Sequence, residues 1–184
     1  MTKLYLFRRY PKLPVVLIVI LVILGVSLLI NRSTRQPSSS TTQTSSVKTK
    51  ATATIGKSFQ FQAVNAQKDT LPVTFTITTI DRKDQIQVKG DPQKASAGKD
   101  YLLVRIEIDN PHTDRLAIAS TDRIRLESES GKLFAPDYHN GNVVIDPLSV
   151  RRDAVVFLVD ANTKKFSFLV GELTGDKQRL AVNF

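Results

Sequence analysis

The chain has 184 residues, no cysteine and a formal net charge of +9 at pH 7. The lack of cysteine excludes disulfides, a lipid-modified cysteine anchor and thiolate metal sites. The positive charge is confined to the N-terminal part: residues 1–58 hold nine lysines and arginines and no acid, whereas residues 59–184 hold 17 basic and 17 acidic residues. The C-terminal part is therefore formally neutral, which argues against nucleic-acid binding.

The most distinctive stretch is residues 13–30, LPVVLIVILVILGVSLLI, which carries no charge. As an α-helix it would span roughly 27 Å, close to the ~30 Å of a bilayer core. Because it is apolar on every side, it predicts a transmembrane helix rather than a helix of a soluble protein. Four basic residues precede it and two follow closely, so residues 1–12 are expected to be a basic cytoplasmic tail, with the rest of the chain outside the cell.

A cleaved signal peptide is the alternative interpretation of this stretch. Signal peptides usually have an apolar core of about 7–15 residues that ends in a small-residue cleavage site. The run here is longer, and residues 25–27, Gly-Val-Ser, match such a site only weakly. We therefore expect an uncleaved signal-anchor in the cell membrane.

Residues 31–56 are expected to be a disordered linker. Serine and threonine dominate residues 31–54, NRSTRQPSSSTTQTSSVKTKATAT, in which a single valine is the only large apolar residue. Such a segment buries too little apolar surface to offset its conformational entropy.

From residue 57 to residue 184, apolar and polar residues alternate with the period of two that is typical of half-buried strands. Roughly eight to ten short strands separated by turn residues predict an all-β domain, an antiparallel β-sandwich, with an up-and-down barrel as the alternative. No stretch shows a helical period. The stretches from which these strands are expected to come lie at 59–63, 73–78, 86–88, 101–109, 116–118, 124–126, 133–134, 143–145, 155–159, 166–168 and 180–184.

Three runs in this region carry a family resemblance: KDYLLVRIEIDNP (99–111), DRIRLESESGKLFAP (122–136) and VVFLVD (155–160). With them the chain resembles bacterial extracytoplasmic domains of unknown function that have an immunoglobulin-like sandwich and are related to the immunoprotective extracellular protein. The matching positions are Asn110, Leu126, Gly131, Phe134, Phe157 and Val159. Where relatives have Pro-Gly before the late strand, this chain has Asp146-Pro147-Leu148. The resemblance implies a tethered or secreted binding or accessory module and supplies no catalytic residues.

The most site-like loop contains Tyr138, His139, Asn140 and Asn142 around a glycine. It offers an aromatic ring, hydrogen-bonding groups and an adaptable backbone, which recognition loops often combine. The same residues would also make an ordinary turn. We treat them as a candidate ligand-contact loop.

Three other features could be functional, but each also has an ordinary structural explanation. The acids Asp81, Asp84, Asp91 and Asp100 lie near two strand ends and could hold calcium, although solvated loops are the default expectation. A threonine row at 74, 76 and 78 could bind a flat lattice or a glycan, but threonine is also a good exposed strand residue. His112, next to a proline, is expected in an exposed turn, and neither histidine has a second ligand nearby in the sequence.

No nucleophile elbow, P-loop or dinucleotide fingerprint occurs, so no catalytic residue, cofactor or metal is expected. The sequence favours a non-catalytic, membrane-anchored binding or accessory module at the cell surface, whose partner is an envelope protein or a cell-wall polymer. The alternatives are an envelope hydrolase with an unrecognised site and a secreted small-ligand carrier.

Overall fold

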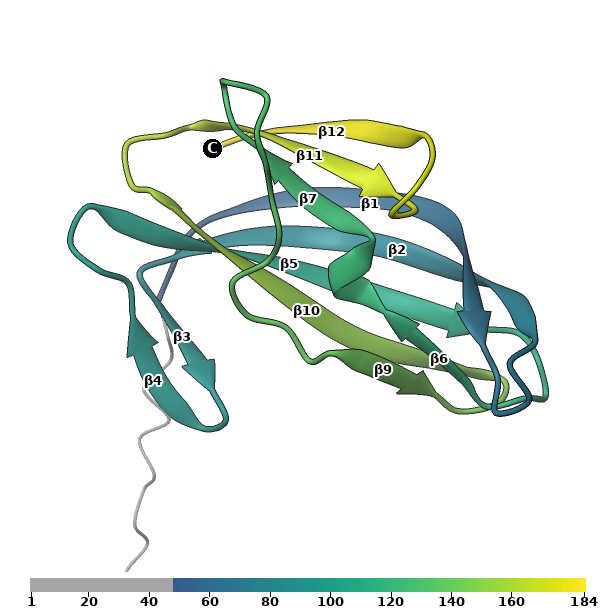
Figure 1. The fold of residues 1–184 in the computed structure, drawn as a ribbon. Coiled ribbons are helices and arrows are strands. Elements are labelled where there is room, and N and C mark those ends of the chain that lie inside the picture. Colours follow the sequence, from purple (N-terminus) through teal and green to yellow (C-terminus); the bar gives the residue numbers. More distant parts are fainter. Residues whose placement is uncertain (1–47) are drawn as a thin grey trace, which may run out of the picture. The chain divides into compact units, whose positions relative to one another are not determined.

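The computed structural model describes residues 48–184, which form twelve strands and one short 3-10 helix (Figure 1). The expected cytoplasmic tail at 1–12, the transmembrane helix at 13–30 and most of the linker at 31–56 lie outside these residues. Within residues 48–184, no helix combines the length and apolarity that crossing a bilayer requires. The elements are β1 Thr49–Val64, β2 Thr70–Lys83, β3 Gln85–Val88, β4 Asp91–Lys94, β5 Lys99–Asn110, β6 Leu116–Ala119, η2 Ser120–Asp122, β7 Ile124–Glu127, β8 Leu133–Phe134, β9 Asn142–Ile145, β10 Ser149–Asp160, β11 Lys165–Gly171 and β12 Lys177–Asn183.

The strands form two main antiparallel sheets that pack as a β-sandwich (Figure 1). The larger sheet has six strands in the order β10-β5-β2-β1-β6-β9, and the smaller has four in the order β12-β11-β7-β8. The hairpin β3-β4 makes a separate two-stranded sheet. The predicted all-β antiparallel sandwich is therefore confirmed.

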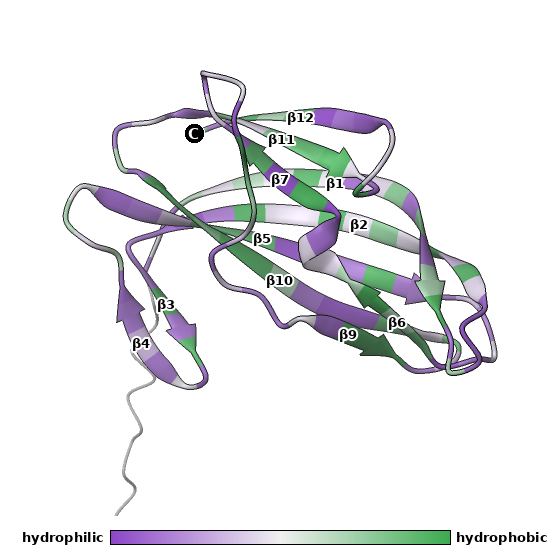
Figure 2. Ribbon diagram, in the orientation of Figure 1, coloured by the Kyte–Doolittle hydropathy of each residue, from purple (hydrophilic) through white to green (hydrophobic). Residues whose placement is uncertain are grey.

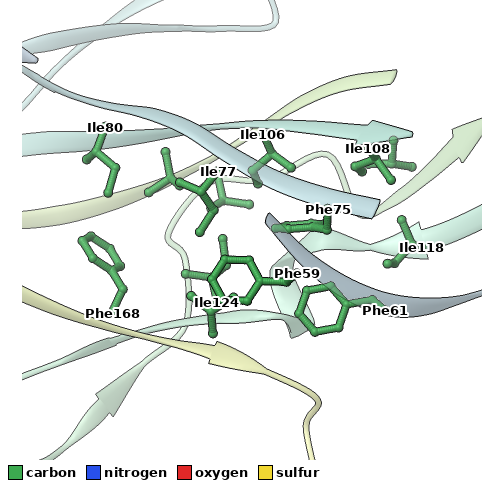
Figure 3. Packing of buried hydrophobic residues seen from close by; sticks show 14 of the residues in the cluster. Phe59, Phe61, Phe75, Ile77, Ile80, Ile106, Ile108, Ile118, Ile124 and Phe168 are labelled. Atoms are coloured by element: carbon green, nitrogen blue, oxygen red, sulfur yellow. The ribbon is translucent and has the colours of Figure 1, made fainter. Parts of the chain in front are cut away.

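The core lies between the two main sheets, and the alternating residues of the sequence fill it (Figures 2 and 3). Phe75 and Phe157 come from the larger sheet and Phe168 from the smaller, and all three are at most 1% exposed. The rings of Phe157 and Phe168 meet edge to face, with centroids 5.5 Å apart, across the two layers. Aromatic pairs prefer this geometry, so the contact helps to fix how the sheets stack.

Strand β1 begins at Thr49, so the expectation that residues 49–56 belong to a disordered linker is wrong. Ala51 pairs with Arg82 and Thr54 with Thr79 on β2, ahead of a register shift at Gly56, whose φ is +62°. Ala51, Ala53 and Ile55 are partly buried while the residues between them are exposed. The segment therefore has the two-sided pattern of a strand, with small residues on its inner side.

The strand expected at 86–88 continues into a hairpin, β3-β4, because residues 91–94 form a second strand that the sequence did not predict. The chain turns at Lys89 and Gly90, whose φ angles are +53° and +92°, and continues into β4. Positive φ at both central residues is the mark of a two-residue type I′ turn, which suits the twist of a hairpin. Pro92 is tolerated because β4 is an edge strand.

Candidate binding groove

Strands β9 and β10 border a groove of about 570 Å³. They are the two edge strands of the six-stranded sheet, yet only residues 146–148 connect them along the chain. The sheet curls so that its two edges approach each other, and β9 lies beside the first half of β10 without a ladder between them (Figure 1). The groove is lined by Arg115, Asn140, Asn142, Val143, Val144, Asp146, Arg151, Arg152 and Asp153.

The groove residue Asp146 is held through its backbone by Asn110, the last residue of β5. Its side chain is fully buried, and its amide nitrogen donates hydrogen bonds to the backbone oxygens of Asp114 at 2.8 Å and Asp146 at 3.0 Å. The backbone N–H of Leu148 donates to the carbonyl of His112 at 2.9 Å. These bonds fasten the loop between β9 and β10 to the loop that follows β5. The groove therefore rests on a fixed support.

The charged groups of the groove have partners, with one exception. Oδ1 of Asp153, which is only 8% exposed, accepts a hydrogen bond from Asn140 Nδ2 at 2.7 Å. Arg115 pairs with Asp146 at 2.8 Å, and Arg152 pairs with Glu107 on β5 at 2.9 Å. Arg151 makes no ion pair with any of residues 48–184. Its guanidinium is thus available to a ligand.

The structure divides the predicted ligand-contact loop. Asn140 and Asn142 line the groove, and Asn142 is the first residue of β9. His139 is exposed, and its Nδ1 accepts the backbone N–H of Gly141 at 3.0 Å, as in an ordinary turn. The two asparagines are thus placed beside Arg151 and Asp153, which the sequence did not single out.

Tyr138 does not line the groove. Its backbone forms a bridge with Val156 of β10, and its ring meets Tyr101 edge to face at 5.9 Å. Together with Ile86 they form a small second core beneath the β3-β4 hairpin. Burial raises the pKa of the Tyr101 hydroxyl, and the hydroxyl of Tyr138 raises it further. The ring of Tyr138 therefore has a packing role.

Two of the four acids considered for a calcium site, Asp81 and Asp100, are buried and form ion pairs with different basic residues. Asp81 and Asp100 are 6% and 2% exposed, so the expectation of solvated loops is wrong for both. Asp81 pairs with Arg105 at 2.9 Å, and Asp100 with Arg82 at 2.7 Å and Lys50 at 2.5 Å. Burial alone would raise the pKa of Asp100, but the bonds from Lys50 and Arg82 outweigh it and lower that pKa. No group of three or more potential metal ligands occurs within residues 48–184.

His112 and the threonine row also have structural contacts. Nε2 of His112 lies 2.8 Å from the carbonyl oxygen of Pro72, and the side chain is partly buried. The hydroxyl of Thr76 lies 2.8 Å from that of Ser58 on the neighbouring strand β1. The row is half-buried, so its hydroxyls serve cross-strand pairing.

Arg151, Arg152 and Asp153 are among the groove residues that sequence reasoning missed. They lie together in the first half of β10, where charged residues interrupt an otherwise apolar strand. The interruption is a signal that the strand leaves the core at this point. The sequence does not show that these charged residues line a groove, because β9 comes to lie beside β10 only when the sheet curls.

No family model matches the sequence, and no curated protein is similar to it. Among solved structures, the chain is similar to a conserved hypothetical protein from Bacillus anthracis, with 14% identity over 72% of this chain and 97% of that one and a TM-score of 0.51. It is also similar to an uncharacterised β-sandwich protein from Clostridium difficile 630, with 17% identity over 69% and 90% of the two chains and a TM-score of 0.47. The first likeness shows a shared fold.

Proposed function

We propose that this chain is a single-pass membrane protein that presents an immunoglobulin-like β-sandwich outside the cell and binds a partner without catalysing a reaction. Residues 13–30 anchor it, with residues 1–12 in the cytoplasm. The binding surface is the groove between β9 and β10. The partner is an envelope protein, or alternatively a cell-wall polymer.

The observation that carries this proposal is the groove itself. Asn110 fixes the loop that contributes Asp146 to it, and its lining side chains can recognise a polar ligand. Both of its carboxylates already have partners, since Asp146 pairs with Arg115 and Asp153 accepts a hydrogen bond from Asn140. Acid–base hydrolysis needs a pair of groups that can exchange protons with a substrate. The carboxylates of Asp146 and Asp153 are instead bonded to neighbouring side chains, which fixes the shape of the groove.

The packing between the sheets also favours surface binding over the carriage of a small apolar ligand. A carrier encloses its ligand in a cavity of several hundred Å³. Here the space between the sheets holds the rings of Phe75, Phe157 and Phe168, which are fully buried and in close contact with their neighbours. A polar groove at the edge of the sheet is the better binding surface.

The experiment is site-specific photocrosslinking in intact cells with the full-length chain. A photoreactive phenylalanine replaces Val144, which is 50% exposed on the groove, and in a control strain Leu173, which is 56% exposed on the β11–β12 loop. We expect one captured protein or polymer at position 144 and none at 173. No capture at 144, or equal capture at both positions, would refute the groove as the binding surface. Carbonate extraction and intact mass test the anchor separately.

A further inference from the structure

The outer edge of β10 has three positions whose backbone groups are unpaired. Val156 exchanges two hydrogen bonds with Tyr138 on the side away from β5, at 2.9 and 3.2 Å. Because N–H and C=O groups alternate sides along a strand, those of Val150, Arg152 and Ala154 point the same way. None of these groups has a backbone hydrogen-bond partner within residues 48–184. They form a free edge of a sheet that opens onto the groove.

The remainder of this edge is closed by the chain itself. Tyr138 bridges to Val156, and the carboxylate of Asp137 accepts the N–H of Leu158 at 2.7 Å. The free part is therefore limited to the five residues 150–154, which extend over roughly 17 Å at about 3.3 Å per residue. This length matches a short extended peptide.

Apolar side chains are exposed beside this free edge. Val144 is 50%, Leu148 70% and Val150 58% exposed, and all three lie on β9, on β10 or in the loop that joins them. Proteins usually protect free edges with charge or by shortening the strand. The edge strand β12 carries Lys177 and Arg179 and no exposed large apolar side chain, whereas the edge of β10 combines Arg151 and Arg152 with these exposed apolar side chains.

Leu148 has an unusual backbone conformation. Its φ is +49°, in the left-handed region that few residues other than glycine and asparagine adopt. Burial of the side chain does not offset this backbone strain within residues 48–184, because the side chain of Leu148 is 70% exposed. Strained residues of this kind cluster at binding sites. The conformation holds an exposed apolar side chain in the loop between β9 and β10, two residues before the free edge begins at Val150.

The charges of Arg151 and Arg152 determine which kind of strand can pair with the free edge of β10. A second copy of the chain that paired all three free positions in the antiparallel sense would place Arg152 opposite Arg152, and like charges directly opposite each other are destabilising. Arg151 has no ion pair within residues 48–184, and Arg152, although it pairs with Glu107, has a side chain that is 86% exposed. A strand with acidic side chains opposite these arginines complements the edge.

We infer that an extended peptide segment of another envelope protein, carrying acidic and apolar residues, adds to the outer edge of β10 as an extra strand and fills the groove beside β9. This inference rests on the proposed function and names its partner class. Main-chain hydrogen bonds at positions 150, 152 and 154 provide affinity, and the arginines and exposed apolar side chains provide selectivity.

The test begins with photoreactive phenylalanine at Val150 in the full-length chain in intact cells, followed by mass-spectrometric mapping of the captured residues. A synthetic peptide of the captured segment is then titrated into the purified protein. Hydrogen exchange of the protein's amides is measured with and without that peptide. Strand addition predicts slower exchange at Val150, Arg152 and Ala154.

Paired substitutions isolate the backbone contribution. Arg152→Ala removes a side chain and keeps its N–H, whereas Arg152→Pro removes both, and an edge strand tolerates proline where its N–H points outward. We expect the proline variant to bind the peptide about ten-fold more weakly than the alanine variant. Ala154→Pro provides a second comparison, against the wild type, if Arg152→Pro lowers the melting temperature.

The outcomes separate the two proposals. Slower exchange at the three amides together with weaker binding of the proline variants supports strand addition. A captured protein without these two effects, a captured polymer or capture of a second copy overturns strand addition and leaves a binding groove in place. No capture at Val150 or Val144 overturns both.

Discussion

Nε of Arg82 on β2 lies 2.7 Å from Oδ2 of Asp100 on β5, and both side chains are buried. The guanidinium also donates to the carbonyl oxygens of Thr163 at 2.7 Å and Ala161 at 2.5 Å, in the turn after β10. Lys50 at the start of β1 reaches the other oxygen of Asp100. One ion cluster thus connects three strands of the larger sheet and the turn that leads to the smaller sheet.

Asp100→Asn is expected to lower the free energy of unfolding by about 3–5 kcal/mol, because removing one partner of a buried pair leaves the other charge uncompensated. Urea denaturation of residues 48–184 measures this change. Asp160→Asn is the matched control, since Asp160 pairs with Lys99 at 2.7 Å but its side chain is 68% exposed. Exposed pairs contribute about 0–1 kcal/mol. If Asp100→Asn and Asp160→Asn lowered the free energy of unfolding equally, the buried pair of Arg82 and Asp100 would stabilise the domain no more than an exposed one.

The free energy of unfolding of the domain should decrease at acid pH because the carboxylate of Asp100 becomes protonated. The pKa of Asp100 in the folded state lies below its ordinary value of 3.8, so folding favours the ionised form. Its contribution is therefore complete above that ordinary value and is lost as the pH falls through the lowered pKa. The difference in unfolding free energy between wild type and Asp100→Asn should be constant near neutral pH and shrink below about pH 4. A difference independent of pH down to pH 2 would contradict this assignment.

Tyr138→Ala is expected to destabilise the domain, although the sequence placed Tyr138 in a candidate ligand-contact loop. The substitution removes the ring that packs on Tyr101 and should cost about 2–4 kcal/mol, since Tyr138 is partly buried. His139→Ala, one residue further in the same loop, should change stability by less than about 0.5 kcal/mol. Thermal unfolding of the two variants measures the contrast. A melting temperature unchanged in Tyr138→Ala would return this ring to the candidate contact residues.

The strands could be predicted from the sequence because the sheet faces alternate cleanly between core and solvent. The run from Tyr101 to Asp109 is an example, with Leu102, Val104, Ile106 and Ile108 all buried. The first part of β1 was missed because its inner residues are Ala51 and Ala53, which are too small to stand out among threonines. The alternation was nevertheless present in the sequence.

The groove could be predicted only in part. Asn140 and Asn142 stood out as loop residues with hydrogen-bonding side chains, and both line it. Their neighbours Arg151 and Asp153 come from a strand at the opposite edge of the same sheet. No local pattern states that a sheet curls until its edges meet, because that depends on the order in which distant strands pair. The buried pair of Arg82 and Asp100 was missed for the same reason.

Asn110 connects the fold to the groove, and its replacement tests that connection. Asn110→Ala removes two donated hydrogen bonds and the bond that its Oδ1 accepts from the His112 N–H at 3.0 Å. Leaving buried polar groups unpaired costs about 1–3 kcal/mol each, so we expect a total loss of about 3 kcal/mol because water can reach some of them. Asn142→Ala, at an exposed asparagine on the groove, should cost less than about 0.5 kcal/mol.

The same variant should loosen the loop between β9 and β10 more than the rest of the domain. The N–H of Leu148, bonded to His112, should exchange faster with solvent in Asn110→Ala, while the N–H groups in the middle of β5 keep their order of protection. Hydrogen exchange resolved by residue measures both sets. If all amides lost protection equally, Asn110 would stabilise the domain as a whole, and the groove would have a different support.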